Sequence, residues 1–308
     1  MASLTLSLTN TAALGLYFIH RYRFLTIEQY ARAAGVSRDT ASDRLREMER
    51  YGFLGHFGNV GMRGYGKVPK AYFLTRKGYE LLKRETDIPE ELFEPYKETH
   101  VATRWSPKMY HRLRTIDLML AAEVAVWERP HLTMVKTFTE YRQVRRGNRV
   151  CRETSDFVDA AETSENRIVP DAAFILENVA TERRALFFLE MDMGTERIVT
   201  KISQDKRLSL HHRFAQYDRY LLGGRYSQTY QAFGEFRSFI MLFVTLSAER
   251  VANIRAQLHD LPEKLADYYR FTTYAEAVAN FLGPVWKSRS PADTRTYALV
   301  REHQRAAS

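Results

Sequence analysis

A pair of short helical patterns joined by a glycine turn constrains the fold of this chain more than any other feature. Thr26 precedes an amphipathic segment that stops at Gly35, which is the order of a capped helix followed by a glycine. Ser37 is positioned to cap a second helix that runs to Arg50. The apolar positions of this second helix recur at helical spacing and are Ala41, Leu45 and Met48. Two helices joined so closely predict a helix-turn-helix, whose second helix fits the major groove of DNA.

The segment after this pair predicts a winged helix. Residues 51–54 end the second helix, and a glycine-rich basic stretch spans residues 58–70. An apolar strand resumes over residues 71–75 and leads into a helix that contains residues 77–82. This order of helix, strand, loose basic loop, strand and helix is typical of winged-helix DNA-binding domains. The alternative is a domain of the same shape that serves only protein contacts or dimerisation.

The candidate DNA contacts are basic and polar residues outside the buried positions. Thr40 and Arg44 lie on the second helix away from its apolar stripe, so we expect them to read bases. The basic residues of the wing are expected to contact phosphates, which position a protein on DNA without reading its sequence. The complete set of candidate DNA-binding residues is Arg38, Thr40, Arg44, Arg46, Arg63, Lys67 and Lys70.

Composition narrows the class of protein further. The chain has 46 Lys and Arg against 37 Asp and Glu, a net charge of +9 that favours encounters with polyanions such as double-stranded DNA. Its single cysteine, Cys151, excludes an internal disulfide and a cysteine-rich zinc site. No apolar run reaches the ~18 residues of a membrane span, so we expect a cytoplasmic protein that does not enter a membrane.

The length of 308 residues favours two domains. We assign the winged helix to residues 1–84, and a linker to residues 85–104 because much of that stretch is rich in Glu and Pro. The second domain is expected over residues 105–288, followed by a flexible tail over residues 289–308.

The second domain has the pattern of a mixed sheet flanked by helices, an α+β or α/β arrangement. A helix with one buried face is expected from Pro107 to Trp127. The remaining expected elements are, in chain order, a strand over 132–141, a basic segment over 142–152, strands over 167–176 and 185–192, a long helix over 196–221, a strand over 239–246, a helix after Ser247, and a last strand and helix that end near Trp286.

Three carboxylates accompany the two apolar strands at 167–176 and 185–192. Asp171 follows a proline in the first, while Glu190 and Asp192 lie two residues apart in the second and therefore share a face. If the strands pair as a hairpin, the three could hold Mg²⁺ or Mn²⁺, which would generate hydroxide for attack on a phosphodiester. The alternative is that the acids reach the surface and pair with nearby cations, for which the candidates are Arg183, Arg197 and Lys201.

These motifs carry a resemblance to known families. Pro170-Asp171 followed by Glu190-x-Asp192, within an order of helix, three strands, helix and strand, resembles the restriction-endonuclease-like PD-(D/E)xK superfamily. A winged helix followed by Pro-Asp and by the segment FLEMDMGTE at residues 188–196 resembles the plasmid replication-relaxation family. That family is similar in turn to relaxases that use this nuclease fold for conjugative mobilisation. The resemblance covers most of the chain, from residue 25 to residue 286.

The resemblance implies a set of site residues. Asp171, Glu190 and Asp192 would be the metal ligands, and His111 would lie near them, as would Glu123 on the same helix. The superfamily lysine is expected two residues after the glutamate, where this chain has Asp192, so the charge would have to come from Lys201. The candidate catalytic residues are therefore Asp171, Glu190, Asp192, Lys201 and His111.

Two functions remain open at this point, besides a third possibility in which the chain acts on another protein and barely contacts DNA. The first is a metal-dependent DNA nickase, a relaxase-like endonuclease that the winged helix directs to a site on double-stranded DNA. The second is a non-catalytic DNA-binding factor for plasmid replication, mobilisation or transcription, whose nuclease-like domain serves dimerisation or the binding of other replication or mobilisation proteins. A homodimer is expected, because regulators with this helix pair usually bind paired half-sites. Tyr217 and Tyr220 are alternatives as strand-transfer nucleophiles, although packing is the better interpretation of both.

Overall fold

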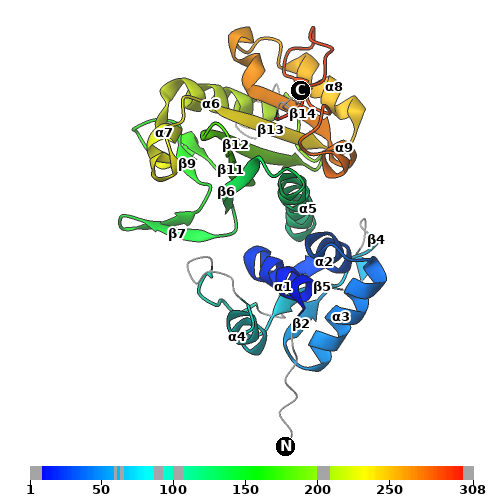
Figure 1. The fold of residues 1–308 in the computed structure, drawn as a ribbon. Helices are drawn as coiled ribbons and strands as arrows, with labels where there is room; N and C mark the ends of the chain where they lie inside the picture. Colours follow the sequence, from blue (N-terminus) through cyan, green and yellow to red (C-terminus); the bar gives the residue numbers. More distant parts are fainter. Residues whose placement is uncertain are drawn as a thin grey trace, which may run out of the picture. The chain divides into compact units, whose positions relative to one another are not determined.

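The computed structural model describes residues 9–58, 61–62, 66–86, 93–99, 107–199 and 209–300, and Figure 1 shows its ribbon. The chain divides into two compact units, residues 1–120 and 121–308. The division falls within helix α5 (Pro107–Trp127), so this one helix gives residues to both units. None of the helices in the described ranges is long and apolar enough to cross a membrane.

The first unit combines helices with a small antiparallel sheet. Its elements before α5 are α1 (Asn10–Tyr22), β1 (Leu25–Thr26), α2 (Ile27–Ala34), α3 (Arg38–Arg50), β2 (Leu54–Phe57), β3 (Gly61–Met62), β4 (Gly66–Lys67), β5 (Ala71–Leu74) and α4 (Arg76–Arg84). Strand β5 pairs with both β1 and β2, which gives the sheet the order β1-β5-β2.

Local capping explains why the predicted helix pair forms. The Thr26 hydroxyl accepts a hydrogen bond from the Gln29 N–H, and the Gln29 side chain bonds back to the Thr26 N–H, so α2 begins with a capping box. Gly35 ends α2 with a φ of 63°, a left-handed conformation that glycine adopts without strain. The Ser37 hydroxyl accepts from the Thr40 N–H and begins α3. Both predicted helices are confirmed, and the expected stripe of α3 is buried at Ala41, Leu45 and Met48.

The strands and the helix predicted after the pair are present as well. β2 and β5 pair with Leu54 opposite Leu74, and Thr75 caps α4. β3 and β4 pair with each other, and residues 63–65 between them lie outside the described residues. The element order matches the prediction, while the winged-helix fold remains an interpretation of that order.

Gly78 in α4 lies directly against the backbone at Phe53. A Cβ at this position would lie 2.0 Å from the Phe53 carbonyl oxygen, so an added methyl group must displace main chain. Although alanine favours a helix over glycine by about 1 kcal/mol, we expect Gly78→Ala to lower the free energy of unfolding by about 1–3 kcal/mol in urea denaturation. Glu80→Ala, an exposed position on the same helix, is the control and should change it by less than about 0.5 kcal/mol. Equal effects of the two substitutions would contradict this close contact.

Residues 93–99 pack onto the first unit. The Tyr79 hydroxyl donates to the Glu94 carbonyl at 3.0 Å, and the Phe93 ring lies 5.7 Å from the His20 ring. This part of the predicted linker is therefore attached to the unit that precedes it. The adjoining residues 87–92 and 100–106 lie outside the described residues.

The second unit is built on a six-stranded mixed sheet. Its main elements after α5 are β6 (Leu132–Thr139), β7 (Gln143–Arg146), β8 (Arg149–Arg152), β9 (Asp156–Phe157), β10 (Arg167–Ile168), β11 (Ala172–Asn178), β12 (Arg183–Asp192), α6 (Leu210–Gly223), α7 (Arg225–Thr229), β13 (Phe239–Thr245), α8 (Ala248–Gln257), β14 (Tyr269–Thr273), α9 (Tyr274–Ala279) and β15 (Lys287–Ser288). The sheet has the order β15-β14-β13-β12-β11-β6, in which β12, β13 and β14 are parallel and the other pairings are antiparallel.

An aromatic core lies between this sheet and helix α6. The core joins Phe188 of β12 and Phe243 of β13 to Phe214 and Tyr217 of α6. Glu190 shares the face of Phe188 because it lies two residues further along β12, so its carboxylate reaches the α6 side of the sheet. The predicted mixed sheet with flanking helices is confirmed, and the nuclease fold proper remains an interpretation.

Helix α6 is shorter than predicted. The sequence predicts a helix over residues 196–221, whereas α6 begins at Leu210, and residues 196–199 are not helical. The Leu210 N–H bonds the Arg197 carbonyl at 3.0 Å. The start of the helix is therefore satisfied by the chain that precedes it rather than by a further turn of helix.

The predicted flexible tail over residues 289–308 is wrong for its first part. Arg289 is 2% exposed and bonds the carboxylate of Asp218, and Tyr297 pairs through its backbone with Trp286. Residues 289–300 are thus held on the second unit by the buried Arg289–Asp218 pair and by the backbone pairing of Tyr297 with Trp286. Residues 301–308 lie outside the described residues.

Two smaller differences concern strands. The basic segment at residues 142–152, to which the sequence assigned no element, forms the β7–β8 hairpin around Gly147, whose φ is 57°. The strand expected over residues 167–176 is interrupted at Pro170, which leaves β10 and β11 as separate strands. Proline has no N–H to give to a sheet, so a break at this position is physically expected.

Candidate functional site

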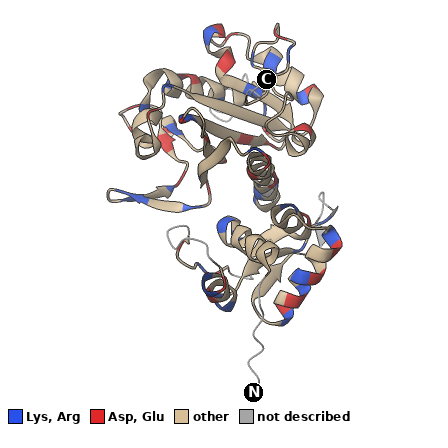
Figure 2. Ribbon diagram, in the orientation of Figure 1, with Lys and Arg blue, Asp and Glu red and all other residues tan. Residues whose placement is uncertain are grey.

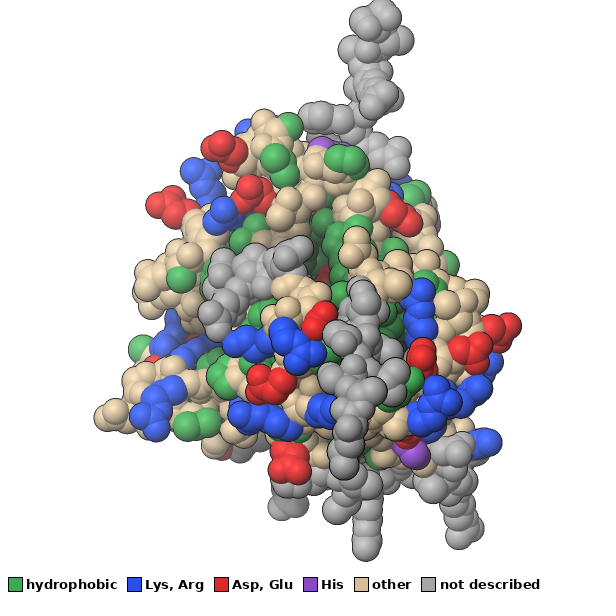
Figure 3. Space-filling model, turned by 60° about the horizontal axis from the view of Figure 1, so that its bottom comes forward, with side chains coloured by type: hydrophobic (Ala, Val, Ile, Leu, Met, Phe, Trp, Pro, Cys, Tyr) green, Lys and Arg blue, Asp and Glu red, His purple; other side chains and the backbone are tan. Residues whose placement is uncertain are grey.

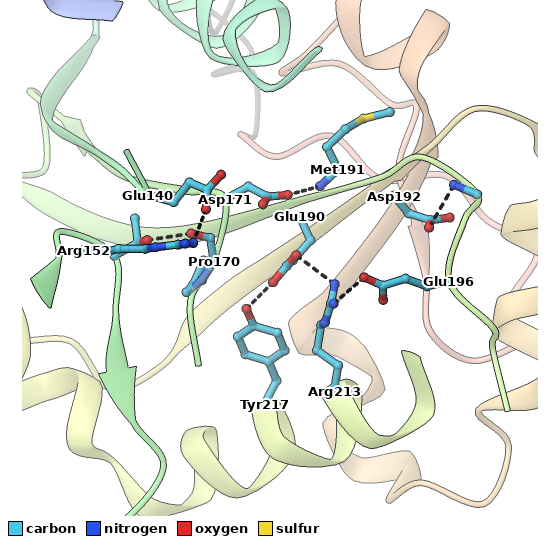
Figure 4. A network of polar contacts seen from close by, with 12 residues as sticks. Glu140, Arg152, Pro170, Asp171, Glu190, Met191, Asp192, Glu196, Arg213 and Tyr217 are labelled. Carbon is cyan, nitrogen blue, oxygen red and sulfur yellow. Dashed lines mark hydrogen bonds and ion pairs between the residues drawn. The ribbon is translucent and has the colours of Figure 1, made fainter. Parts of the chain in front are cut away.

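Three adjacent strands bring carboxylates together at one end of the sheet. β11 pairs with β6 on one side and with β12 on the other, and this register makes Glu140, Asp171 and Glu190 neighbours across the strands (Figure 4). The Glu140 N–H donates to the Asp171 carbonyl at 3.2 Å, and the Met191 N–H donates to Asp171 Oδ2 at 2.8 Å. The backbone of the neighbouring strands therefore orients Asp171 from both sides.

Glu140 and Asp171 belong to a group that could hold a metal ion. His111, Glu140 and Asp171 each offer one ligand atom, and these atoms lie within 4.8 Å of one another in the described part of the chain. Carboxylate oxygens are the donors that Mg²⁺ and Mn²⁺ prefer, and imidazole nitrogen is a common ligand for transition metals. The donor chemistry fits the expected divalent cation. Glu140 also forms an ion pair with Arg152 at 2.6 Å, which a bound cation would have to displace or share.

Glu190 is buried, and side chains of α6 bind its carboxylate. Its carboxylate accepts a hydrogen bond from the Tyr217 hydroxyl at 2.5 Å and another from the Arg213 guanidinium at 3.3 Å (Figure 4). Burial raises the pKa of Glu190 to about 8, an effect that the Arg213 charge opposes and the Asp171 charge increases. Both Glu190 oxygens thus have partners on α6, and the carboxyl group favours its protonated form at neutral pH.

Arg213 and Tyr217 are fixed by the same network. Arg213 also bonds Glu196 at 2.7 Å, and although burial alone would lower the pKa of Arg213, the charges of Glu190 and Glu196 raise it. Burial and the Glu190 charge raise the pKa of Tyr217 well above its ordinary value, so its hydroxyl keeps its proton. Tyr220 is similarly buried and donates to Asp156. Both tyrosines act as hydrogen-bond donors in the core, as the packing interpretation expected.

Asp192 has a separate set of partners. Its carboxylate pairs with the Arg250 guanidinium, whose Nη2 lies 3.1 Å from Oδ1, and it accepts from the Thr245 hydroxyl at 3.2 Å and the Gly194 N–H at 3.1 Å. The sequence predicted that Asp171, Glu190 and Asp192 converge on one metal ion, and the structure does not bring the three together. Asp192 extends toward α8 instead, because Arg250 neutralises it there.

Comparison with known protein families identifies the family to which this chain belongs. The model of the family described as Replication-relaxation matches residues 16–235, which is well over half of the chain. The chain belongs to the replication-relaxation family. This membership suggests a protein associated with plasmid replication. Comparisons with curated proteins and with solved structures found no match.

The replication-relaxation protein supplies arginines where a lysine was expected. Arg250 neutralises the acid at the lysine position, and Arg213 places a guanidinium beside Glu190 from α6. The predicted substitute Lys201 lies outside the described residues. Glu123 of α5, which the resemblance placed near the site, is buried, with 2% of its surface exposed.

The residues predicted to contact DNA from α3 of the replication-relaxation protein differ in their exposure and in the partners that their side chains already have. Thr40, Arg38 and Arg46 are exposed. Arg38 pairs with Glu28 at 2.9 Å, and Arg46 pairs with Asp43 at 3.3 Å. Arg44 is half-buried and donates to the Thr11 hydroxyl at 2.7 Å. Lys and Arg alternate with Asp and Glu along α3 (Figure 2), and the face in Figure 3 also mixes both signs. The role of these residues in DNA binding remains a prediction.

The predicted wing contacts can be followed only in part. Lys67 is exposed, whereas Lys70 pairs with Glu49 at 2.8 Å and lies 4.6 Å from the centre of the Tyr72 ring. Arg63 lies outside the described residues. Lys70 must leave Glu49 to reach a phosphate, so Lys67 is the stronger candidate of the two.

Sequence reasoning missed Glu140 and the α6 partners of Glu190. Glu140 follows a weakly patterned strand, and only the register of β6 against β11 shows that it adjoins Asp171. Arg213 lies one helical turn before Tyr217, a spacing that puts both on one face of α6. That spacing was visible in the sequence, but the strand that the helix faces was not.

Proposed function

We propose that this replication-relaxation protein is a metal-dependent DNA nickase that acts in plasmid replication or mobilisation. The observation that carries the proposal is the Glu140–Asp171 pair, which belongs to a group that could hold a metal ion and of which Asp171 is the acid of the Pro-Asp motif. The first unit would locate the DNA site through α3, and the second would cut one strand. The substrate is double-stranded DNA in the cytoplasm, and a homodimer would match paired half-sites.

The roles of the side chains follow from their contacts. Asp171 and Glu140 would hold Mg²⁺ or Mn²⁺, with His111 as the third ligand. A bound cation would supply Lewis-acid chemistry, polarising a phosphodiester and lowering the pKa of a water molecule. Tyr217 and Arg213 hold Glu190 beside this group, and Arg213 supplies positive charge on the α6 side. Asp192 with Arg250 would shape the end of β12 rather than bind the cation.

A second candidate function is a non-catalytic DNA-binding factor. The observation that favours it is Asp192, which occupies the expected lysine position and is neutralised by Arg250. In that case the second unit would serve dimerisation or the binding of plasmid replication and mobilisation proteins. The two candidates share DNA binding and differ in strand cleavage.

Cleavage of supercoiled plasmid DNA separates the two candidates. The substrate should carry the replication origin of the replicon that encodes the chain, and the reaction should contain Mg²⁺ or Mn²⁺. We expect conversion to the open circular form, lost in Asp171→Asn and Glu140→Gln and retained in Glu177→Gln, a β11 carboxylate that pairs with Arg184 instead. Titration of Mn²⁺, followed by the signal of the free ion, should show weaker binding for the first two variants only. Binding of the origin without cleavage under either metal would favour the non-catalytic factor.

A further inference from the structure

The β7–β8 hairpin concentrates positive charge in a short two-stranded ribbon. Residues 142–152 contain five arginines and no aspartate or glutamate. Figure 1 shows the hairpin extending from the sheet, and Figure 2 shows Lys and Arg coloured along it. Three of the five form ion pairs, Arg142 with Glu153 at 3.8 Å, Arg149 with Glu162 at 3.0 Å and Arg152 with Glu140 at 2.6 Å. Within the described residues, Arg145 and Arg146 have no carboxylate partner.

The register of the hairpin assigns its side chains to two faces. Arg145 lies opposite Val150 and Gln143 lies opposite Arg152, and these four residues share one face because positions alternate along each strand. All four are exposed, and the Val150 side chain is 61% exposed. The Arg145 side chain has no ion-pair or hydrogen-bond partner within the described ranges. One face of the ribbon therefore exposes Arg145 beside Gln143 and Val150, while Arg152 is held by Glu140.

The other face contains a pair of like charges. Arg146 lies directly opposite Arg149 next to the turn, and two arginines in such a pair repel each other. The charge of Arg149 is offset by an ion pair with Glu162 at 3.0 Å. Arg146 donates a hydrogen bond to the Glu153 carbonyl at 2.8 Å. Phosphate groups would relieve this repulsion more fully than one ion pair and a neutral carbonyl, since they bring negative charge to both side chains.

We propose that the β7–β8 ribbon enters a groove of double-stranded DNA and that Arg145 and Arg149 contact its phosphates. The major groove admits a two-stranded β-ribbon, and a ribbon with arginines on both faces can reach the backbone on either side. The proposal rests on the proposed DNA-binding function and adds a second contact surface to the one expected on α3.

The base of the ribbon connects it to the candidate metal group. Arg152 pairs with Glu140 at 2.6 Å, and the Thr154 hydroxyl after β8 donates to the Pro170 carbonyl at 2.6 Å, next to Asp171. The Glu153 carboxylate accepts from the Thr139 N–H at 2.8 Å. DNA held by the ribbon is thereby brought beside the ends of β6 and β11. The ribbon would place the phosphodiester backbone, and α3 would choose the sequence.

Equilibrium binding of the full chain to a duplex with the origin sequence, followed by fluorescence anisotropy at several salt concentrations, tests the ribbon. Arg145→Ala and Arg149→Ala should each weaken binding roughly fivefold at ~0.15 M salt and lower the salt slope by about 0.9. Arg145→Lys should restore most of the affinity, because a lysine still contacts phosphate. Arg225→Ala is the matched control, since Arg225 bonds the same Glu162 as Arg149, at 2.9 Å, but lies in α7.

The outcomes separate the ribbon from the proposed nickase. Unchanged affinity and salt slope in the Arg145→Ala/Arg149→Ala double variant would overturn the ribbon, even if the wild type nicks its origin. Weaker binding by the double variant, with the Arg225→Ala control unchanged, would support it even if the wild type cleaves nothing. Equal weakening by all of these variants, together with a lower melting temperature in each, would overturn the ribbon as a specific contact.

Discussion

Replacing Asp218 with alanine is expected to lower the free energy of unfolding of the second unit by about 3–5 kcal/mol. Asp218 and Arg289 are 4% and 2% exposed, and Arg289 Nη1 lies 2.8 and 3.0 Å from the two carboxylate oxygens. The Tyr269 hydroxyl donates to the same carboxylate at 2.5 Å. Without Asp218, the guanidinium stays buried with no counter-charge, and its lost hydration is no longer compensated. Urea denaturation followed by tryptophan fluorescence measures the loss, since Trp286 is fully buried nearby in sequence.

The matched control lies one residue further along the same helix. Arg219 pairs with Asp159 at 2.8 Å, but the two side chains are 53% and 38% exposed. Arg219→Ala should therefore cost no more than about 1 kcal/mol. An Asp218→Leu/Arg289→Met double variant should recover most of the stability, because it removes both charges together. A loss for Asp218→Ala as small as that for Arg219→Ala would show that the pair does not hold residues 289–300 in place.

The elements that the sequence predicted well are those whose causes are local. The α2–α3 pair follows from Thr26, Gly35 and Ser37, each within a few residues of the bond it makes. β12 follows from a continuous apolar run. The β7–β8 hairpin was missed because arginine-rich strands lack the apolar alternation that marks a half-buried strand. Its pairing depends on a turn at Gly147 and on backbone bonds rather than on a buried face.

The errors at helix α6 and at the tail have a common origin. Residues 196–199 were predicted as the first turn of this helix, yet the carbonyls of Arg197 and Ile198 accept hydrogen bonds from the first N–H groups of α6 instead. Residues 289–300 have a polar composition typical of a tail, yet Arg289 finds a buried partner at Asp218. In both cases a contact between distant segments outweighs local propensity.

For the candidate site, too, the sequence predicted what local motifs mark and missed what depends on distant partners. Asp171 and Glu190 were found because short motifs mark the ends of strands, and the strand pairing makes them neighbours. Asp192 was assigned to the same site by the period of a strand, which correctly puts it on the face of Glu190. Its partner Arg250 lies 58 positions away, so no local pattern could show that this acid is already neutralised.

Stability should fall as the pH rises from 5 to 8, and Glu190→Gln should remove this fall. Burial raises the pKa of Glu190 to about 8 from an ordinary value of 4.5, so between these values the folded chain binds a proton that the unfolded chain has released. The stabilisation is complete below pH 4.5 and is lost as the pH rises through about 8. The loss between pH 5 and pH 8 should be on the order of 3 kcal/mol in the wild type.

The groups around Glu190 determine the sign of this effect. Asp171 and Glu196 raise its pKa, while Arg213 and the Tyr217 hydroxyl lower it, and burial exceeds the latter two. Glutamine is neutral at every pH and can still accept the Tyr217 bond, so the variant should lose the slope without losing the fold. Glu177→Gln, at a partly exposed carboxylate of β11, is the control and should keep the wild-type slope. Unfolding curves at pH 5, 6, 7 and 8 measure the difference, and parallel curves for wild type and Glu190→Gln would mean that Arg213 keeps Glu190 ionised throughout.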